Sequence, residues 1–157
     1  MSGTFKPRMD VLPLAQQRLW PELRSAPSLG FTLYGGTAIA LRLGHRDSVD
    51  FDFFSDKPLD RDGIKAAFPF VAQSTTLQDH GNTWVVLAPS GDSERERVKV
   101  SFFGTIAFGR VGEPDFTDDG VLQVASFDDL MATKLKVVLQ RAEAKDYRDE
   151  PRWSMPG

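Results

Sequence analysis

Two aspartates, Asp50 and Asp52, stand one residue apart in the segment 48–54, SVDFDFF. Apolar residues alternate with polar ones here, and this pattern predicts a strand with one apolar and one polar face. Both carboxylates would point to the polar face about 6 to 7 Å apart, where they repel each other by roughly 2.5 kcal/mol. A bridging divalent cation would relieve that repulsion, and oxygen ligands favour Mg²⁺ or Mn²⁺. The alternative is a solvated face of an edge strand.

A glycine pair lies upstream of the aspartates, in the segment 34–37, YGGT. Gly35 and Gly36 would let the backbone approach a ligand closely, and free N–H groups at a helix start attract phosphate. Thr37 adds a hydroxyl. The chain contains no P-loop pattern, G-x-x-x-x-G-K-[ST], so this turn would be a different kind of phosphate site. The alternative is a tight turn in which Thr37 caps the next helix.

The two features are close in sequence, and together they suit a nucleoside triphosphate carried with its magnesium. A short helix over 38–43, ended by Gly44, would separate the glycine turn from the acidic strand. Arg46 and Ser48 are spaced by even numbers of residues from the aspartates. If the strand extends back to residue 46, their side chains would lie on the same face and could help to hold phosphate oxygens.

Two further candidates lie near the end of the chain. Ser126 would open the longest helix, running to about Arg141, and a helical wheel places Lys134 within its apolar stripe. Such a lysine either snorkels to the edge of the stripe or points at a site such as a triphosphate. Asp146 is either part of a solvated, charged helix end or a further carboxylate for metal binding or base catalysis.

The elements that would position these residues are mixed. A short helix framed by Pro13 and Pro21 is expected within the opening segment 11–23, and a second helix over 60–67. Strands are expected over 29–34 and 121–125, and a hairpin from arms 83–88 and 95–103. The fold class is therefore α/β (α+β), a mixed sheet flanked by helices. We expect one domain over 1–150 and an irregular tail over 151–157. The charged hairpin tip is either solvated or in contact with an RNA backbone through Arg95, Arg97 and Lys99.

The amino-acid composition excludes several kinds of catalytic and binding site. The 157 residues include no cysteine and only His45 and His80, so a thiolate nucleophile or a histidine-rich metal centre is excluded. The net charge of −3 argues against an extended basic groove for nucleic acid. The longest uncharged run, 25–41, is too short and too broken by glycine and proline to span a bilayer. With no apolar signal segment, we expect a cytoplasmic protein without a membrane partner.

The segment 34–55, YGGTAIALRLGHRDSVDFDFFS, resembles the abortive-infection AbiEii-like nucleotidyltransferase toxins. Their first motif is a G-G-T turn followed by R-x-S-x-D-x-D-F. A later helical lysine and a K/R-D-x-x-D element of that family match Lys134 and the run Lys145 to Asp149. The resemblance extends over about 31–149.

The resemblance implies a polymerase-beta-like nucleotidyltransferase fold and an enzyme of the nucleotidyltransferase class (EC 2.7.7). The expected reaction is metal-dependent transfer of a nucleotide from an NTP to an acceptor, such as the 3′ end of a transfer RNA or a protein. A cognate antitoxin is the expected partner. The implied site comprises the metal-binding and catalytic Asp50 and Asp52, the catalytic Lys134 and Asp146, and the nucleotide-binding Gly35, Gly36, Thr37, Arg46 and Ser48.

The sequence departs from the family's pattern at two points, and these leave open an alternative to a catalytic protein. Ser101 is expected where the wider superfamily often carries a third carboxylate, and the chain ends soon after the K-D-x-x-D element. We therefore expect a minimal or C-terminally short member of the family. The alternatives are a degenerate, non-catalytic nucleotide-binding module or a protein-interaction module of the same fold.

Overall fold

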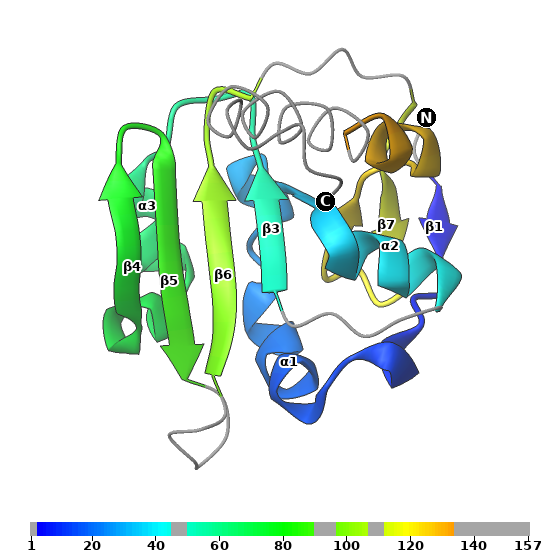
Figure 1. Ribbon diagram of the computed structural model, residues 1–157, viewed down its shortest axis with the longest axis horizontal. Helices are drawn as coiled ribbons and strands as arrows, with labels where there is room; N and C mark the ends of the chain where they lie inside the picture. Colours follow the sequence, from blue (N-terminus) through cyan, green and yellow to red (C-terminus); the bar gives the residue numbers. More distant parts are fainter. Residues whose placement is uncertain (1–2, 45–49, 90–96, 107–111, 134–157) are drawn as a thin grey trace, which may run out of the picture.

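A mixed sheet dominates the computed structural model, which describes residues 3–44, 50–89, 97–106 and 112–133. Within these residues the sheet has the strand order β1-β7-β8-β2-β3-β6-β5-β4 (Figure 1). The strands are β1 (Thr4–Phe5), β2 (Thr32–Tyr34), β3 (Asp50–Phe54), β4 (Thr75–His80), β5 (Thr83–Pro89), β6 (Arg97–Phe103), β7 (Asp115–Thr117) and β8 (Gln123–Val124).

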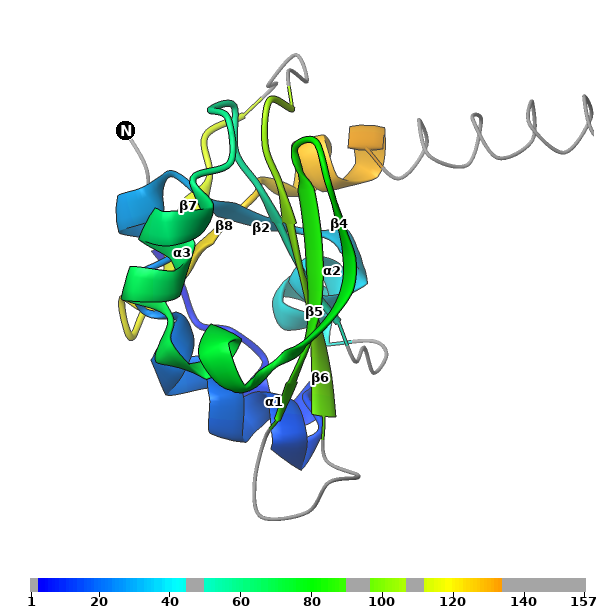
Figure 2. The same ribbon diagram turned by 90° about the vertical axis from the view of Figure 1, so that its left-hand side faces the viewer.

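Helices cover both faces of this sheet. They are α1 (Leu14–Leu19), α2 (Gly35–Leu43), α3 (Arg61–Ala67), a helix over 127–133, and the 3-10 turns η1 (Met9–Val11), η2 (Trp20–Leu23), η3 (Pro27–Leu29) and η4 (Pro69–Gln73). Figure 2 shows α1 and α3 on one side of the sheet and the helix over 127–133 on the other. The expected α+β class, with a mixed sheet and flanking helices, is confirmed.

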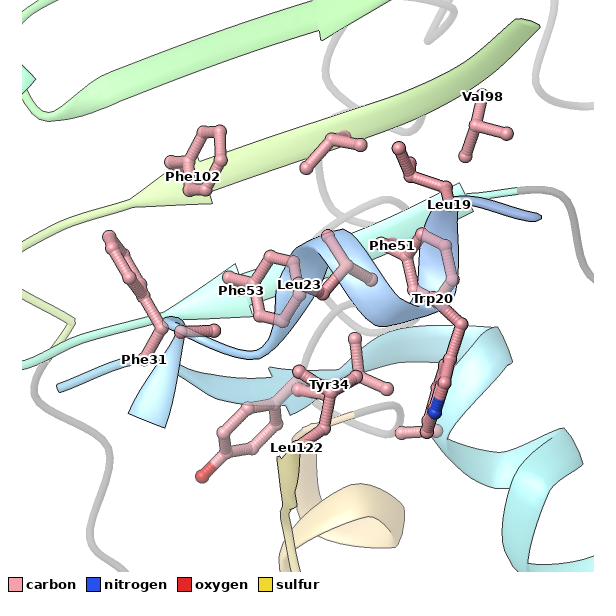
Figure 3. Close-up of a cluster of buried hydrophobic side chains, with 14 of the residues drawn as sticks. Leu19, Trp20, Leu23, Phe31, Tyr34, Phe51, Phe53, Val98, Phe102 and Leu122 are labelled. Carbon is pink, nitrogen blue, oxygen red and sulfur yellow. The ribbon is translucent and has the colours of Figure 1, made fainter. Parts of the chain in front are cut away.

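An aromatic core fills the space between the sheet and α1 with η2. Phe51 and Phe53 on β3 and Phe102 on β6 are fully buried (Figure 3). The ring centroids of Phe53 and Phe102 lie 5.9 Å apart, and Trp20 lies 6.3 Å from Phe51. Because burying each such ring contributes about 1.5–3 kcal/mol, this face fixes the register of β3.

Most of the expected elements are present with shifted ends. The short helix expected between Pro13 and Pro21 is α1, which is followed directly by the 3-10 turn η2. Helix α3 begins after Asp60, whose carboxylate accepts a 3.0 Å hydrogen bond from the Gly63 N–H. The hairpin expected from arms 83–88 and 95–103 is the antiparallel pair β5–β6. The strand expected over 29–34 begins only at Thr32, because η3 and a left-handed Gly30 (φ +86°) occupy its start.

The prediction that Thr37 caps the helix after the glycine pair is wrong. Helix α2 begins at Gly35, with Tyr34 as its N-cap residue and no side-chain cap. Its other end is as expected, because Gly44 adopts a left-handed conformation (φ +67°) there. Strands β1, β4 and β7 were not expected from the sequence.

The side chain of Arg42 ties the end of α2 to the strands beside it. Its guanidinium donates to the backbone oxygens of Ala125 (2.8 Å) and Val124 (3.2 Å). It also forms an ion pair with Asp115 (3.1 Å) and lies over the Phe5 ring, 4.5 Å from the centroid. Helix 127–133 starts directly after these carbonyls, so Arg42 links the two helices on this side of the sheet.

Ser126 caps the helix over 127–133, as expected. Its hydroxyl accepts a 3.1 Å hydrogen bond from the Asp129 N–H and donates to the Asp129 carboxylate at 2.9 Å. None of the helices within the described ranges is both long enough and apolar enough to cross a membrane. The tail over 151–157 lies outside the described residues, and the single domain over 1–150 stays a prediction.

Candidate active site

Asp50 and Asp52 lie on the same face of β3, opposite the buried Phe51 and Phe53, as predicted. Neighbouring strands surround them on both sides. Asp52 is in register with Tyr34 of β2 and with Ser101 of β6. Both aspartates therefore stand near the middle of the sheet, held by a strand whose other face is anchored in the core, and the edge-strand alternative does not apply.

The electrostatic surroundings of Asp52 favour its protonated form. Burial and the negative charge of Asp50 raise the pKa of Asp52 from 3.8 to about 6, against the opposing effects of the Lys99 ammonium and a hydrogen bond with Ser101. Burial is the larger cause, because a charged carboxylate loses hydration there. A cation beside the pair would offset both causes at once, so the arrangement is one that binding of a divalent metal would stabilise.

Gly35 lies directly against the Asp52 carboxylate. A Cβ at this position would overlap Oδ2 of Asp52 and lie 3.3 Å from its Cγ, and Gly35 has a left-handed φ of +83°. Both observations require glycine here. The start of α2 and the acidic pair are therefore in contact, as the proximity of the two motifs predicted.

Thr37 has a structural position within this contact. Its side chain is buried, and its hydroxyl donates to the backbone carbonyl of Asp50. This hydrogen bond fixes the first turn of α2 against the start of β3. Thr37 thus positions the glycine turn, and its expected contact with a nucleotide stays a prediction.

Lys99 is a site residue that sequence reasoning placed elsewhere. The sequence pattern assigns Lys99 to the charged hairpin tip, whereas in the structure it is exposed and in register with Asp50 on the adjacent strand. Lys99 and Ser101 are two residues apart in β6, so their side chains lie on the same face of the strand. Only the pairing of β6 with β3 shows that this face lies beside Asp50 and Asp52.

Ser101 occupies the expected position next to Asp52, where a third carboxylate would otherwise stand. It is buried and hydrogen bonds to Asp52. Within the described part of the chain, no group of three or more Asp, Glu, His or Cys side chains could hold a metal ion. The oxygen donors of Asp50 and Asp52, both carboxylates on one face, nevertheless match the ligand preference of Mg²⁺.

The remaining predicted site residues, Arg46, Ser48, Lys134 and Asp146, lie outside the described residues. The helix expected to carry Lys134 is described over 127–133 and starts where expected. Their roles stay predictions.

The fold is that of a nucleotidyltransferase. The chain resembles a solved structure of a candidate nucleotidyltransferase from H. pylori with a TM-score of 0.54 and 20% sequence identity, over 77% of this chain and 55% of the other. The chain belongs to the nucleotidyl transferase AbiEii toxin family of type IV toxin–antitoxin systems, which matches residues 18–149. The family and fold implied by the sequence motifs are thereby confirmed.

A curated relative is an uncharacterized protein of Aquifex aeolicus (strain VF5), 31% identical over 133 residues. The match covers 81% of this chain and 61% of the relative. The chain thus spans about three fifths of that relative and little more than half of the solved structure.

Proposed function

We propose that the protein is a metal-dependent nucleotidyltransferase that moves a nucleotide from an NTP to an RNA acceptor and acts as the toxin of a toxin–antitoxin pair. The observation that carries this proposal is the contact between the Gly35 turn and the Asp52 carboxylate, next to Asp50 on the same face. It brings a candidate phosphate site and a candidate metal site together on one side of the sheet.

Asp50 and Asp52 would hold Mg²⁺ or Mn²⁺, which supplies positive charge to the phosphates of the bound nucleotide. The turn at Gly35 and Gly36 presents backbone N–H groups at the start of α2, where no side chain caps the helix. These groups would bind phosphate oxygens. Lys99 adds a positive charge beside Asp50, suited to the same polyanion.

The predicted residues outside the described ranges complete the proposal. Arg46 and Ser48 would contact phosphate oxygens, Lys134 would neutralise the departing pyrophosphate, and Asp146 would accept the proton of the acceptor hydroxyl or complete the metal site. A new bond forms between the acceptor oxygen and the α-phosphorus, and the bond to pyrophosphate breaks. The acceptor would be the 3′ end of a transfer RNA, and a cytoplasmic antitoxin would restrain the activity.

The proposal is tested by incubating the full chain with each labelled NTP, MgCl₂ and total RNA. We expect label in RNA that requires Mg²⁺ and is lost in Asp50→Asn. Asp62→Asn, at an exposed position on α3, is the matched control and should keep the activity.

Two other outcomes would overturn the proposal. Metal-dependent NTP binding without transfer to RNA or protein would identify a degenerate nucleotide-binding module. Absence of NTP binding at every magnesium concentration would favour a protein-interaction module of the same fold.

A further inference from the structure

A row of three aromatic rings crosses the sheet on the face that carries the acidic pair. Tyr34 stacks on Phe54, with ring centroids 4.6 Å apart and planes 14° from parallel. Phe103 meets Phe54 edge-on, at 5.3 Å and 90°. These rings come from three adjacent strands, β2, β3 and β6.

Two rings of this row, Phe54 and Phe103, lie on the other face of the sheet from the buried Phe53 and Phe102. Side chains alternate between the faces of a strand, so Phe54 and Phe103 point away from the face on which Phe53 and Phe102 are buried. Phe54 and Phe103 are half-buried, whereas Phe53 and Phe102 have no exposed surface. Phe54 and Phe103 therefore contribute to a partly open face, whereas Tyr34 is buried in the core cluster and Phe54 packs against that cluster.

The row continues directly from the carboxylates. Tyr34 is the cross-strand partner of Asp52, and Phe54 follows Asp52 by two residues on the same face, about 7 Å along the strand. Phe103 is the cross-strand partner of Phe54. A ligand whose phosphates lie at Asp50 and Asp52 has only to extend along β3 to reach these rings.

We propose that Phe54 and Phe103, backed by Tyr34, bind the base of the nucleotide by stacking. This subsite rests on the proposed function, because it assumes that the triphosphate lies at the acidic pair. Every base has a π-face, so stacking strengthens binding of all four nucleotides and favours purines by their larger rings. The rings thus distinguish a nucleotide from a bare polyphosphate.

The test compares the binding of Mg²⁺-bound NTPs with that of Mg²⁺-bound tripolyphosphate, which has no base, by isothermal titration calorimetry. The full chain should bind the NTPs more tightly than tripolyphosphate by roughly ten- to a hundredfold. Phe54→Leu and Phe103→Leu keep an apolar side chain but remove the ring. Each should reduce that preference several-fold while leaving the affinity for tripolyphosphate unchanged.

Phe116→Leu is the matched control. Phe116 is also half-buried, but it lies on β7, three strands from β3, and should leave both affinities unchanged. In NMR spectra of the complex, stacking should move the base protons upfield with the native chain and less with Phe103→Leu.

The outcomes separate this inference from the proposed function. Equal affinities for NTP and tripolyphosphate, or a preference that survives both leucine variants, would overturn the stacking subsite and leave the metal–phosphate site intact. If neither ligand binds with Mg²⁺, the proposed function itself fails, and the stacking subsite fails with it.

Discussion

The backbone of Gly35 and the carboxylate of Asp52 are packed so closely that no side chain fits between them. This contact joins the first turn of α2 to β3, two elements that are separated by the rest of α2 in the sequence. It also explains why the motif holds glycine at this position. An alanine there would need both a left-handed backbone and a displaced carboxylate.

Gly35→Ala should therefore damage both stability and binding. We expect a loss of about 1–3 kcal/mol in the free energy of unfolding and a fall of roughly a hundredfold in the affinity for Mg²⁺-bound NTP. Urea denaturation and calorimetry measure the two quantities. Gly120→Ala is the control, since Gly120 has a similar φ of +74° but nothing within 4 Å of a Cβ. If both variants bind NTP normally, the contact does not position the site.

The raised pKa of Asp52 predicts how stability depends on pH without metal. Between pH 3.8 and about 6, the folded state keeps a proton that the unfolded state has released. The free energy of unfolding therefore falls as the pH rises through this window, by up to about 3 kcal/mol, and the loss persists at higher pH. Below this window both states are protonated and the effect disappears.

Asp52→Asn should remove this pH dependence and stabilise the metal-free protein at pH 8. Urea denaturation at pH 4, 5, 6 and 8 in the presence of a chelator measures it. Mg²⁺ should stabilise the native chain at pH 8 but not at pH 4.5, where Asp52 is protonated. If the difference in the free energy of unfolding between the native chain and Asp52→Asn is the same at all four pH values, Asp52 titrates normally.

Lys99→Met should raise the pKa of Asp52 further, because the ammonium group lowers it in the native chain. NMR titration of the carboxyl carbons measures the pKa directly. Arg97→Met removes the same charge two residues earlier on β6, further from Asp52, and should have a smaller effect. Equal effects of the two variants would indicate a general loss of positive charge and not a specific pairing.

Arg42→Ala should destabilise the fold by about 2–3 kcal/mol, because the backbone oxygens of Val124 and Ala125 and the Asp115 carboxylate lose their common donor. Asp10→Ala is the comparison, since it breaks the exposed, solvent-screened ion pair with Arg8 and should leave the free energy of unfolding nearly unchanged. Thermal or urea unfolding distinguishes them. Similar losses in the free energy of unfolding for the two variants would mean that the contacts of Arg42 do not stabilise the packing of α2.

Local signals were sufficient for the parts of the fold in which one face is buried. The alternation around Asp50 and Asp52 predicts β3 and its polar face, and the segment 60–67 is predicted as a helix, which the structure shows as α3 with Asp60 as its N-cap residue. In both cases the evidence lies within a few residues of the element. Hydrophobic burial or a cap then fixes the structure that the pattern indicates.

Other elements depend on partners distant in sequence. Strand β4 is exposed along its whole length and shows no alternation, so only pairing with β5 defines it. Strand β1 has two residues and pairs with β7 across most of the chain. The role of Lys99 likewise depends on the register between β3 and β6, which no local pattern specifies. Thr37 looks like a cap, but its hydroxyl bonds to the backbone of β3.

Asp52 has residue 34 on one side and residue 101 on the other, because β3 lies between β2 and β6. A growing chain that has not yet reached β6 therefore contains the acidic motif but lacks the neighbour that hydrogen bonds to it. The segment that carries Asp50 and Asp52 is synthesised early, whereas β6, which carries Ser101, is synthesised later. The pairing of β3 with both of its neighbours is therefore complete only once residues 97–103 have been synthesised.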